Sequence, residues 1–191
     1  MRDTLLAQGL FCSLYTDRGS HYWHTPTAGG KVDKANPTQF GRAMAHLGIE
    51  MIPAYSPEAR GRLVKELAAE GITTMSAANR YLSQVYLPAF NEEFARPARE
   101  PGTAFVPLMG VVLEEVLCEH FERTVGHDNC VSFERLKLQI PQDRHRMHYV
   151  KTKVRVHRYP DQSLAIFHGP RKLAQYDAKG NQTKTILEAV A

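Results

Sequence analysis

Cysteine and long apolar runs are scarce in this sequence. The three cysteines, Cys12, Cys118 and Cys130, stand far apart without a C-x-x-C pair. Their spacing predicts neither a disulfide framework nor a zinc site, and we expect reduced thiols. No stretch approaches the roughly 18 consecutive apolar residues of a membrane span, and the apolar patch after Met1 is too short for a signal peptide. The sequence therefore predicts a cytoplasmic protein with no membrane partner.

Charge is present in ordinary amount but is unevenly distributed. The 191 residues are 23% charged and 43% hydrophobic, with a net charge of +4, which is typical of a globular chain. Up to Cys130 there are 12 lysines and arginines against 15 aspartates and glutamates, and after it 12 against 5. A basic C-terminal module is the pattern expected of a nucleic-acid partner, although a solvated surface produces the same pattern.

The first hundred residues alternate between strand-like and helix-like patterns. We expect strands over residues 9–15 and 49–55, and amphipathic helices over 36–46, 63–70 and 76–94, the last with Ser76 as its cap. This alternation favours an α/β sheet with helical crossovers. A segment rich in proline and arginine follows at 96–102, and a further helix is expected over 111–121.

From about residue 131 the periodicity becomes that of β-strands. Val150, Thr152, Val154 and Val156 alternate with Lys151, Lys153, Arg155 and His157, so one strand face is apolar and the other cationic. Turn residues at 158–163 and 177–181 complete the pattern of a small antiparallel module. The candidate phosphate-binding residues are Lys151, Lys153, Arg155 and Arg158, extended by Arg144, Arg146, Arg171 and Lys172. The other interpretations are a solvent-facing sheet and an RNA-binding or protein-binding barrel.

Three motifs in the first half carry a resemblance to a known family. They are Tyr15-Thr16-Asp17-Arg18-Gly19-Ser20-His21-Tyr22, then Gly48-Ile49-Glu50, and finally the run from Ala54-Tyr55-Ser56-Pro57 to Arg60-Gly61-Arg62. In this order they resemble bacterial insertion-sequence transposases with a retroviral-integrase-type (DDE, RNase H-like) catalytic core, most closely the ISNCY-like group. Leu87-Pro88-Ala89-Phe90-Asn91 and the segment 144–170 are similar to that group's downstream region.

The resemblance implies a fold and a domain order. Residues 1–100 would be a partial α/β RNase H-like core, residues 101–130 a helical linker, and residues 131–191 a basic, β-rich, SH3-like barrel that binds transposon-end DNA. The implied partner is double-stranded DNA, with a second copy of the chain or an intact transposase as a further partner.

The resemblance also implies a metal-dependent strand-transfer site. Such cores use two Mg²⁺ or Mn²⁺ ions held by three carboxylates, and Asp17 matches the second of the three by its place in the Y-T-D-x-G motif. Asp3, in a polar stretch, does not match the first. The third, a glutamate, should follow Arg62 closely, but the sequence resembles one shortened there by on the order of ten residues. Glu58 and Glu66 are the acids that could replace it.

Two functional hypotheses follow. The first is a transposase or integrase-type DNA recombination protein by descent, catalytically defective because two of its three metal-binding carboxylates are missing. The alternative is a non-catalytic DNA-binding remnant that occupies transposon ends or joins intact transposase.

Overall fold

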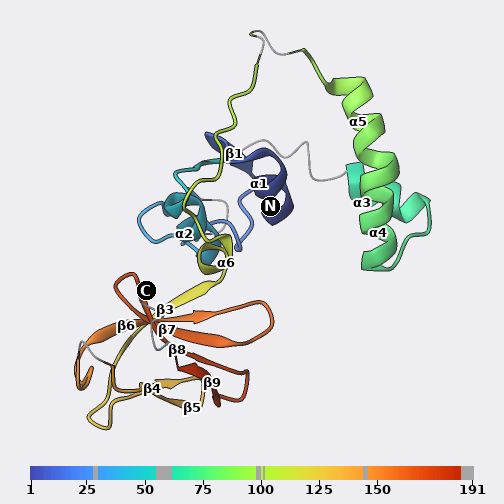
Figure 1. Cartoon of the computed structure of the whole chain (residues 1–191). Coiled ribbons are helices and arrows are strands. Elements are labelled where there is room, and N and C mark those ends of the chain that lie inside the picture. The colour runs from blue at the N-terminus through green and yellow to red at the C-terminus, as the bar shows by residue number, and fades with distance from the viewer. Residues whose placement is uncertain (28–29, 55–61, 98–99, 101, 144–145, 186–191) are drawn as a thin grey trace. The chain divides into compact units, whose positions relative to one another are not determined.

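The computed structural model describes residues 1–27, 30–54, 62–97, 100, 102–143 and 146–185 (Figure 1). The chain divides into two compact units. One comprises Met1–Ile52 together with Phe105–Ala191, and the other comprises Pro53–Ala104.

The N-terminal part of the first unit follows the predicted order of elements. It contains α1 (Arg2–Gln8), β1 (Ser13–Thr16), α2 (Gln39–His46) and β2 (Glu50–Pro53), and β1 and β2 form a two-stranded sheet. Helix α2 begins at Gln39, three residues later than expected, because Thr38 caps it, its hydroxyl oxygen accepting a hydrogen bond from the Gly41 amide. The strand expected over 9–15 is divided: Leu10 pairs with Val106, and β1, which pairs with β2, begins at Ser13.

A compact apolar cluster holds these elements together. Its fully buried centre is Leu5 of α1 and Met44 of α2, and the short helix α6 (Leu113–Val116) closes it with two further side chains. The buried members are Leu5, Trp23, Ala43, Met44, Leu47, Ile49, Met51, Leu113 and Val116. Leu113 and Val116, which come after the second unit in the sequence, are therefore part of this core.

The C-terminal part of the first unit is antiparallel β-structure, as the strand periodicity predicts. A five-stranded sheet has the order β3-β6-β7-β8-β9, from β3 (Glu119–Thr124), β6 (Lys153–Arg158), β7 (Leu164–His168), β8 (Arg171–Tyr176) and β9 (Gln182–Thr185). A separate hairpin joins β4 (Cys130–Phe133) to β5 (Leu136–Gln139). In the described residues no ladder closes this sheet into a barrel.

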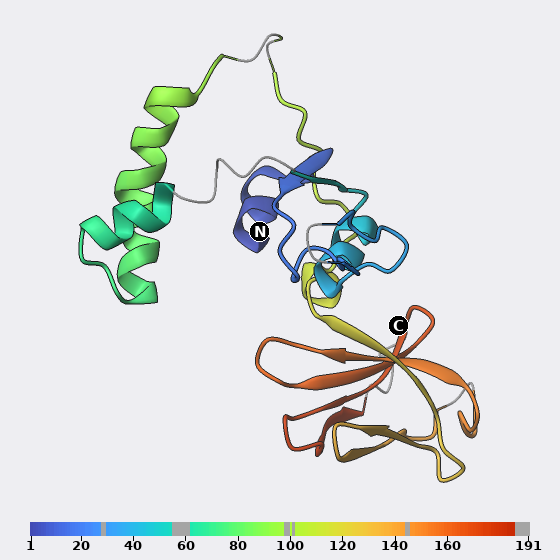
Figure 2. The same ribbon diagram turned by 180° about the vertical axis from the view of Figure 1, so that it is seen from behind.

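The hairpin and the sheet enclose one apolar core between them. Figure 2 shows the β4–β5 hairpin beside the strands of the sheet, seen from behind. The inner side chains of both contribute to a cluster that comprises Val125, Val131, Phe133, Leu138, Ile140, Tyr149, Val154, Val156, Leu164, Ile166, Leu173, Ala174 and Tyr176. The expected turn at 177–181 is confirmed, with Asp177 accepting hydrogen bonds from the Lys179 and Asn181 amides.

The helix expected over 111–121 is wrong over most of its length. Helix α6 ends at Val116, and strand β3 begins at Glu119. All six residues of β3 pair with β6, from Glu119 opposite Arg158 to Thr124 opposite Lys153. Pairing with β6 satisfies the backbone polar groups of both strands. This gain outweighs the helical spacing of the apolar residues in the segment. The β-sheet thus begins upstream of residue 131.

The second unit is helical where it is described. It contains α3 (Arg62–Ala69) and a continuous helical run made of α4 (Met75–Tyr81), the π-helical turn η2 (Leu82–Tyr86) and α5 (Leu87–Phe94). The expected helices over 63–70 and 76–94 are confirmed, but the cap is Thr74 and not Ser76, because Thr74 accepts from the Ala77 amide. Within the described residues, none of the protein's helices has the length and apolar character needed to cross a membrane.

Candidate functional site

The predicted alternation of cationic and apolar residues on β6 is confirmed from Lys153 to Val156. Lys153 and Arg155 are exposed, whereas Val154 and Val156 are buried. Successive strand residues point to opposite faces, so Lys153 and Arg155 share the outer face of the sheet. The Lys153 ammonium lies 2.7 Å from the Glu122 carboxylate, and the Arg155 guanidinium donates to the Gly169 carbonyl at 2.7 Å.

Acidic residues on neighbouring elements balance part of this positive charge. Glu122 lies opposite Arg155 in the β3–β6 ladder. Arg158 has the strand parity of Val154 and Val156, so it does not share a face with Lys153, and the expectation of one common face is wrong for it. Its guanidinium lies 5.2 Å from the Phe121 ring centroid and bonds Glu119 at 2.6 Å and Glu134 at 2.7 Å. These acids come from β3 and the β4–β5 turn, elements whose register the sequence did not reveal.

The remaining predicted basic residues that the structure describes lie in loops and at the start of β8. Lys151 is exposed in a turn, with a φ of 60°. The Arg146 guanidinium lies 5.3 Å from the Tyr149 ring centroid, Arg171 pairs with Asp143 at 3.2 Å, and Lys172 pairs with Glu115. Arg144 lies outside the described residues.

Asp17 lies at the end of β1, as the motif predicts. Its carboxylate is exposed and accepts a hydrogen bond from the Gly19 amide at 2.8 Å, the geometry of an Asx turn. Glu58 falls outside the described residues, and Glu66 lies on α3 in the second unit. Among the described side chains, Asp17 belongs to no group of three potential metal ligands. The described residues therefore do not fit a three-carboxylate Mg²⁺ site.

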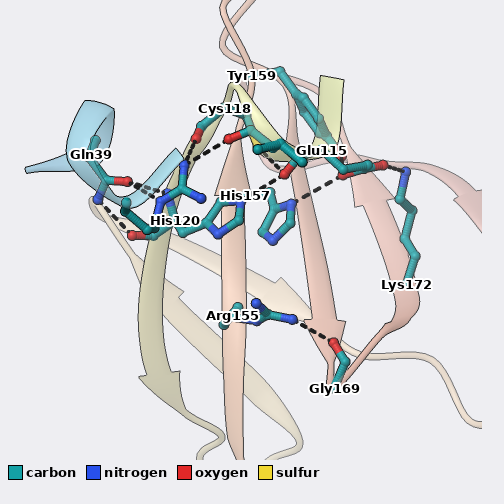
Figure 3. A network of polar contacts seen from close by, with 11 residues as sticks. Gln39, Glu115, Cys118, His120, Arg155, His157, Tyr159, Gly169 and Lys172 are labelled. Atoms are coloured by element: carbon teal, nitrogen blue, oxygen red, sulfur yellow. Dashed lines mark hydrogen bonds and ion pairs between the residues drawn. The ribbon is translucent and has the colours of Figure 1, made fainter. Parts of the chain in front are cut away.

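The densest polar network of the first unit is centred on Glu115 of α6. Its carboxylate accepts hydrogen bonds from the Tyr159 hydroxyl and the Lys172 ammonium, and one of its oxygens lies 3.1 Å from Nδ1 of His157 (Figure 3). Burial opposes ionisation of Glu115, but these three partners outweigh burial and lower its pKa. Helix α6 is thereby attached to β6 and β8 through one ionised carboxylate.

Two histidines and one cysteine contact Glu115, His157 at its carboxylate and the other two at its backbone carbonyl. His120 and His157 lie opposite each other in the β3–β6 ladder, with ring centroids 3.7 Å apart and planes 12° from parallel. Burial lowers the pKa of both histidines to about 4, so both rings are neutral at pH 7. Burial likewise raises the pKa of the Cys118 thiol to about 11. The thiol donates to the Glu115 carbonyl at 3.3 Å.

Helix α2 is attached to the same region by two polar side chains. The Arg42 guanidinium donates to the Val116 carbonyl at 2.9 Å and to the Cys118 carbonyl at 2.6 Å. Gln39 makes two hydrogen bonds with the backbone of His120, donating to its carbonyl at 2.8 Å and accepting from its amide at 2.9 Å (Figure 3). These contacts satisfy backbone groups where helix α6 gives way to strand β3.

Sequence reasoning did not single out this network. The local signal was Cys118-x-His120, a spacing that places two potential ligands on one short segment. The alternation placed His157 on the cationic face of its strand, but the structure buries it to 3% exposure, and the β3–β6 register brings it opposite His120.

Comparison with known proteins gives one significant similarity. The chain is 33% identical over 142 residues to a protein of Sinorhizobium fredii (strain NBRC 101917 / NGR234) named "Putative transposase y4bF". This similarity relates the chain to a transposase. The match covers 68% of this chain and 31% of that relative, so most of the relative's length has no counterpart in the match. No family model matches the chain.

Proposed function

We propose that this chain acts in transposase-type DNA recombination and that its own contribution is to bind DNA through the phosphate backbone. The observation that carries the proposal is the 33% identity, over 68% of the chain, to a protein named as a transposase. The exposed basic residues after position 130 support it, because phosphate contacts by lysine and arginine dominate the affinity of DNA-binding proteins.

The most favourable part of the surface for such contacts is the exposed end of β6. Lys151 and Lys153 lie two residues apart and are exposed, and Arg155 follows on the outer face with its guanidinium oriented by the Gly169 carbonyl. An exposed pair such as Lys153–Glu122 is weak, so a phosphate can take the place of the carboxylate.

We extend the proposal to the domains of the chain. Residues 1–100 would be the partial RNase H-like core of a DDE transposase, and residues 131–191, with strand β3 added to their sheet, its SH3-like DNA-binding domain. Asp17 would remain from the metal site, and the chain would occupy transposon ends without catalysing strand transfer.

The experiment is fluorescence anisotropy of the full chain with a short DNA duplex at several salt concentrations. We expect saturable binding whose logarithm falls linearly with log salt. The double variant Lys151→Ala/Lys153→Ala should reduce that slope by about 1 to 2, at about 0.9 per phosphate neutralised.

The matched control is Lys31→Ala/Lys34→Ala, which removes the same charge from two exposed lysines elsewhere in the unit. Equal effects of the two double variants would place the DNA contacts away from β6. No saturable binding at low salt by a folded chain would contradict the proposed DNA function itself.

A further inference from the structure

Three side chains that the proposed DNA binding does not use come together around the start of β3. Cys118, His120 and His157 each offer a ligand atom, and these atoms all lie within 4.8 Å of one another. Cys118 and His120 lie two residues apart where β3 begins, and His157 is on β6. In the part of the chain that the structure describes, no other three potential ligands approach so closely.

One member of this cluster, His157, has an unsatisfied polar atom. Its Nδ1 lies 3.1 Å from the Glu115 carboxylate, which favours the proton on Nδ1 and leaves a lone pair on Nε2. That Nε2 is buried and has no hydrogen-bond partner, in a side chain that is only 4% exposed. Buried polar atoms are nearly always paired, so an unpaired one marks a position where a ligand would be stabilised.

His120 has the complementary arrangement. Its Nε2 lies 2.8 Å from the Glu115 carbonyl, an acceptor only, so the proton sits on Nε2 and the lone pair on Nδ1. One glutamate therefore fixes the tautomers of both rings, through its carboxylate for His157 and its carbonyl for His120. Metal-bound histidines are oriented in this way by a carboxylate or a carbonyl on the nitrogen that does not bind the metal.

We propose that Cys118, His120 and His157 bind one Zn²⁺ ion. One thiolate and two imidazoles are the sulfur and nitrogen donors that zinc prefers, whereas Mg²⁺ selects oxygen ligands. Binding forms one Zn–S and two Zn–N bonds, and the thiol proton of Cys118 is released to solvent. With three protein ligands, a water molecule completes the tetrahedron.

Zinc binding requires one histidine ring to turn, and the structure indicates which one. Ligands at about 2.3 Å for sulfur and 2.0–2.1 Å for nitrogen lie about 3.3–3.6 Å from one another in a tetrahedron, shorter than the present limit of 4.8 Å. Stacked, nearly parallel rings cannot both direct in-plane lone pairs at one ion. His157 is held by Glu115 and by stacking on Phe167 at 4.0 Å, so the half-buried His120 ring is the one that turns.

The ion would connect two strands and the end of a helix. Cys118 lies two residues after α6, His120 is on β3 and His157 is on β6. Zinc would therefore stabilise the join between the helical and the β-sheet parts of the first unit, because a ligand that binds only the folded state stabilises that state.

The test uses the full, untagged chain, reduced and stripped of metal, with Co²⁺ as a coloured substitute for Zn²⁺. The background is Cys12→Ser/Cys130→Ser, which leaves Cys118 as the sole thiol. We expect one equivalent of Co²⁺ to produce a thiolate-to-cobalt charge-transfer band together with the intense visible bands of tetrahedral cobalt. One equivalent of Zn²⁺ should abolish both.

Two further variants test whether His157 is a nitrogen ligand. His157→Gln should weaken Co²⁺ and Zn²⁺ binding at least tenfold, whereas His127→Gln, at an exposed histidine outside the cluster, should leave it unchanged. Circular dichroism of each metal-free variant checks that it is folded. Absence of the charge-transfer band in the folded sole-thiol chain would overturn the proposal, as would equal affinities of the two histidine variants.

Discussion

Arg42 is a single side chain on which two parts of the first unit depend. Its guanidinium bonds the carbonyls of Val116 and Cys118, and Nε also donates to Gln39 at 3.1 Å. Burial lowers the pKa of this guanidinium, but arginine is so basic that it remains charged at neutral pH. A charged donor to two backbone carbonyls is among the stronger hydrogen-bonding arrangements.

We expect Arg42→Met to lower the free energy of unfolding by about 2 to 4 kcal/mol, because two carbonyls lose a charged donor while most of the aliphatic stem remains. Urea denaturation of the full chain measures the loss. The control is Arg2→Met, since the pair that Arg2 makes with Glu114 is exposed, and its effect should be much smaller. Equal losses for the two variants would show that the Arg42 contacts contribute little.

His157 shows where prediction at the residue scale ends. The alternation of lysine, valine and arginine on β6 follows from strand geometry, and it holds from Lys153 to Val156. An alternation with a period of two residues does not show which residues of other elements cover the outer face of a sheet. His157 is buried because Glu115 and Phe167 lie against it, and neither contact is local in sequence.

At the scale of elements, the helices of the second unit present apolar side chains to solvent. Tyr86, Phe90 and Phe94 recur every four residues, with ring centroids 5.8 Å and 4.7 Å apart along the ladder. The π-turn η2 ends two residues before Pro88, which has no amide hydrogen to donate and whose ring crowds the preceding turn. None of the described residues between 53 and 104 is buried.

We expect the amides of α4 and α5 to exchange with deuterium much faster than those of β6 and β7. A segment with little buried apolar surface opens at a small free-energy cost, whereas the sheet is closed by a full core. Hydrogen-exchange mass spectrometry of the full chain compares the two directly. Equal protection would mean that a further partner, such as a second copy of the chain, covers the aromatic ladder.

Elements were predicted well where the signal was local. The helices α2, α3 and the run from α4 to α5 follow from amphipathic spacing, and the turn at 177–181 follows from its own side chains. Strand β3 could not be found in this way, because a helix and an edge strand suit its sequence equally until β6 is placed beside it. The Cys118 and histidine cluster was missed for the same reason.

At the scale of the whole molecule, the transposase relationship and the state of the catalytic site lead to different expectations. A relative at 33% identity supports a shared ancestry, whereas catalysis needs a complete set of carboxylates around two ions. Asp17 is in the position that the motif predicts, but its described surroundings do not supply that set. Sequence comparison alone therefore says more about origin than about chemistry.

We expect neither Mg²⁺ nor Mn²⁺ to support nicking or strand transfer by the purified chain. The measurement is cleavage of labelled DNA, with Asp17→Ala as the matched variant and the anisotropy assay as a check that both proteins still bind. Metal-dependent activity that Asp17→Ala abolishes would contradict the proposed loss of catalysis and would mean that another carboxylate completes the site.

The chain leaves the first unit after Ile52 and re-enters it at Phe105. Near both points its backbone is hydrogen-bonded to the short segment 10–12. The Glu50 amide bonds the Cys12 carbonyl at 2.9 Å, and Leu10 and Val106 exchange two backbone hydrogen bonds of 2.7 Å and 2.8 Å. Residues 53–104 lie between these two hydrogen-bonded points of the sequence. The length of this segment can change over evolution without disturbing the surrounding fold, so insertions and deletions among relatives should accumulate between residues 53 and 104.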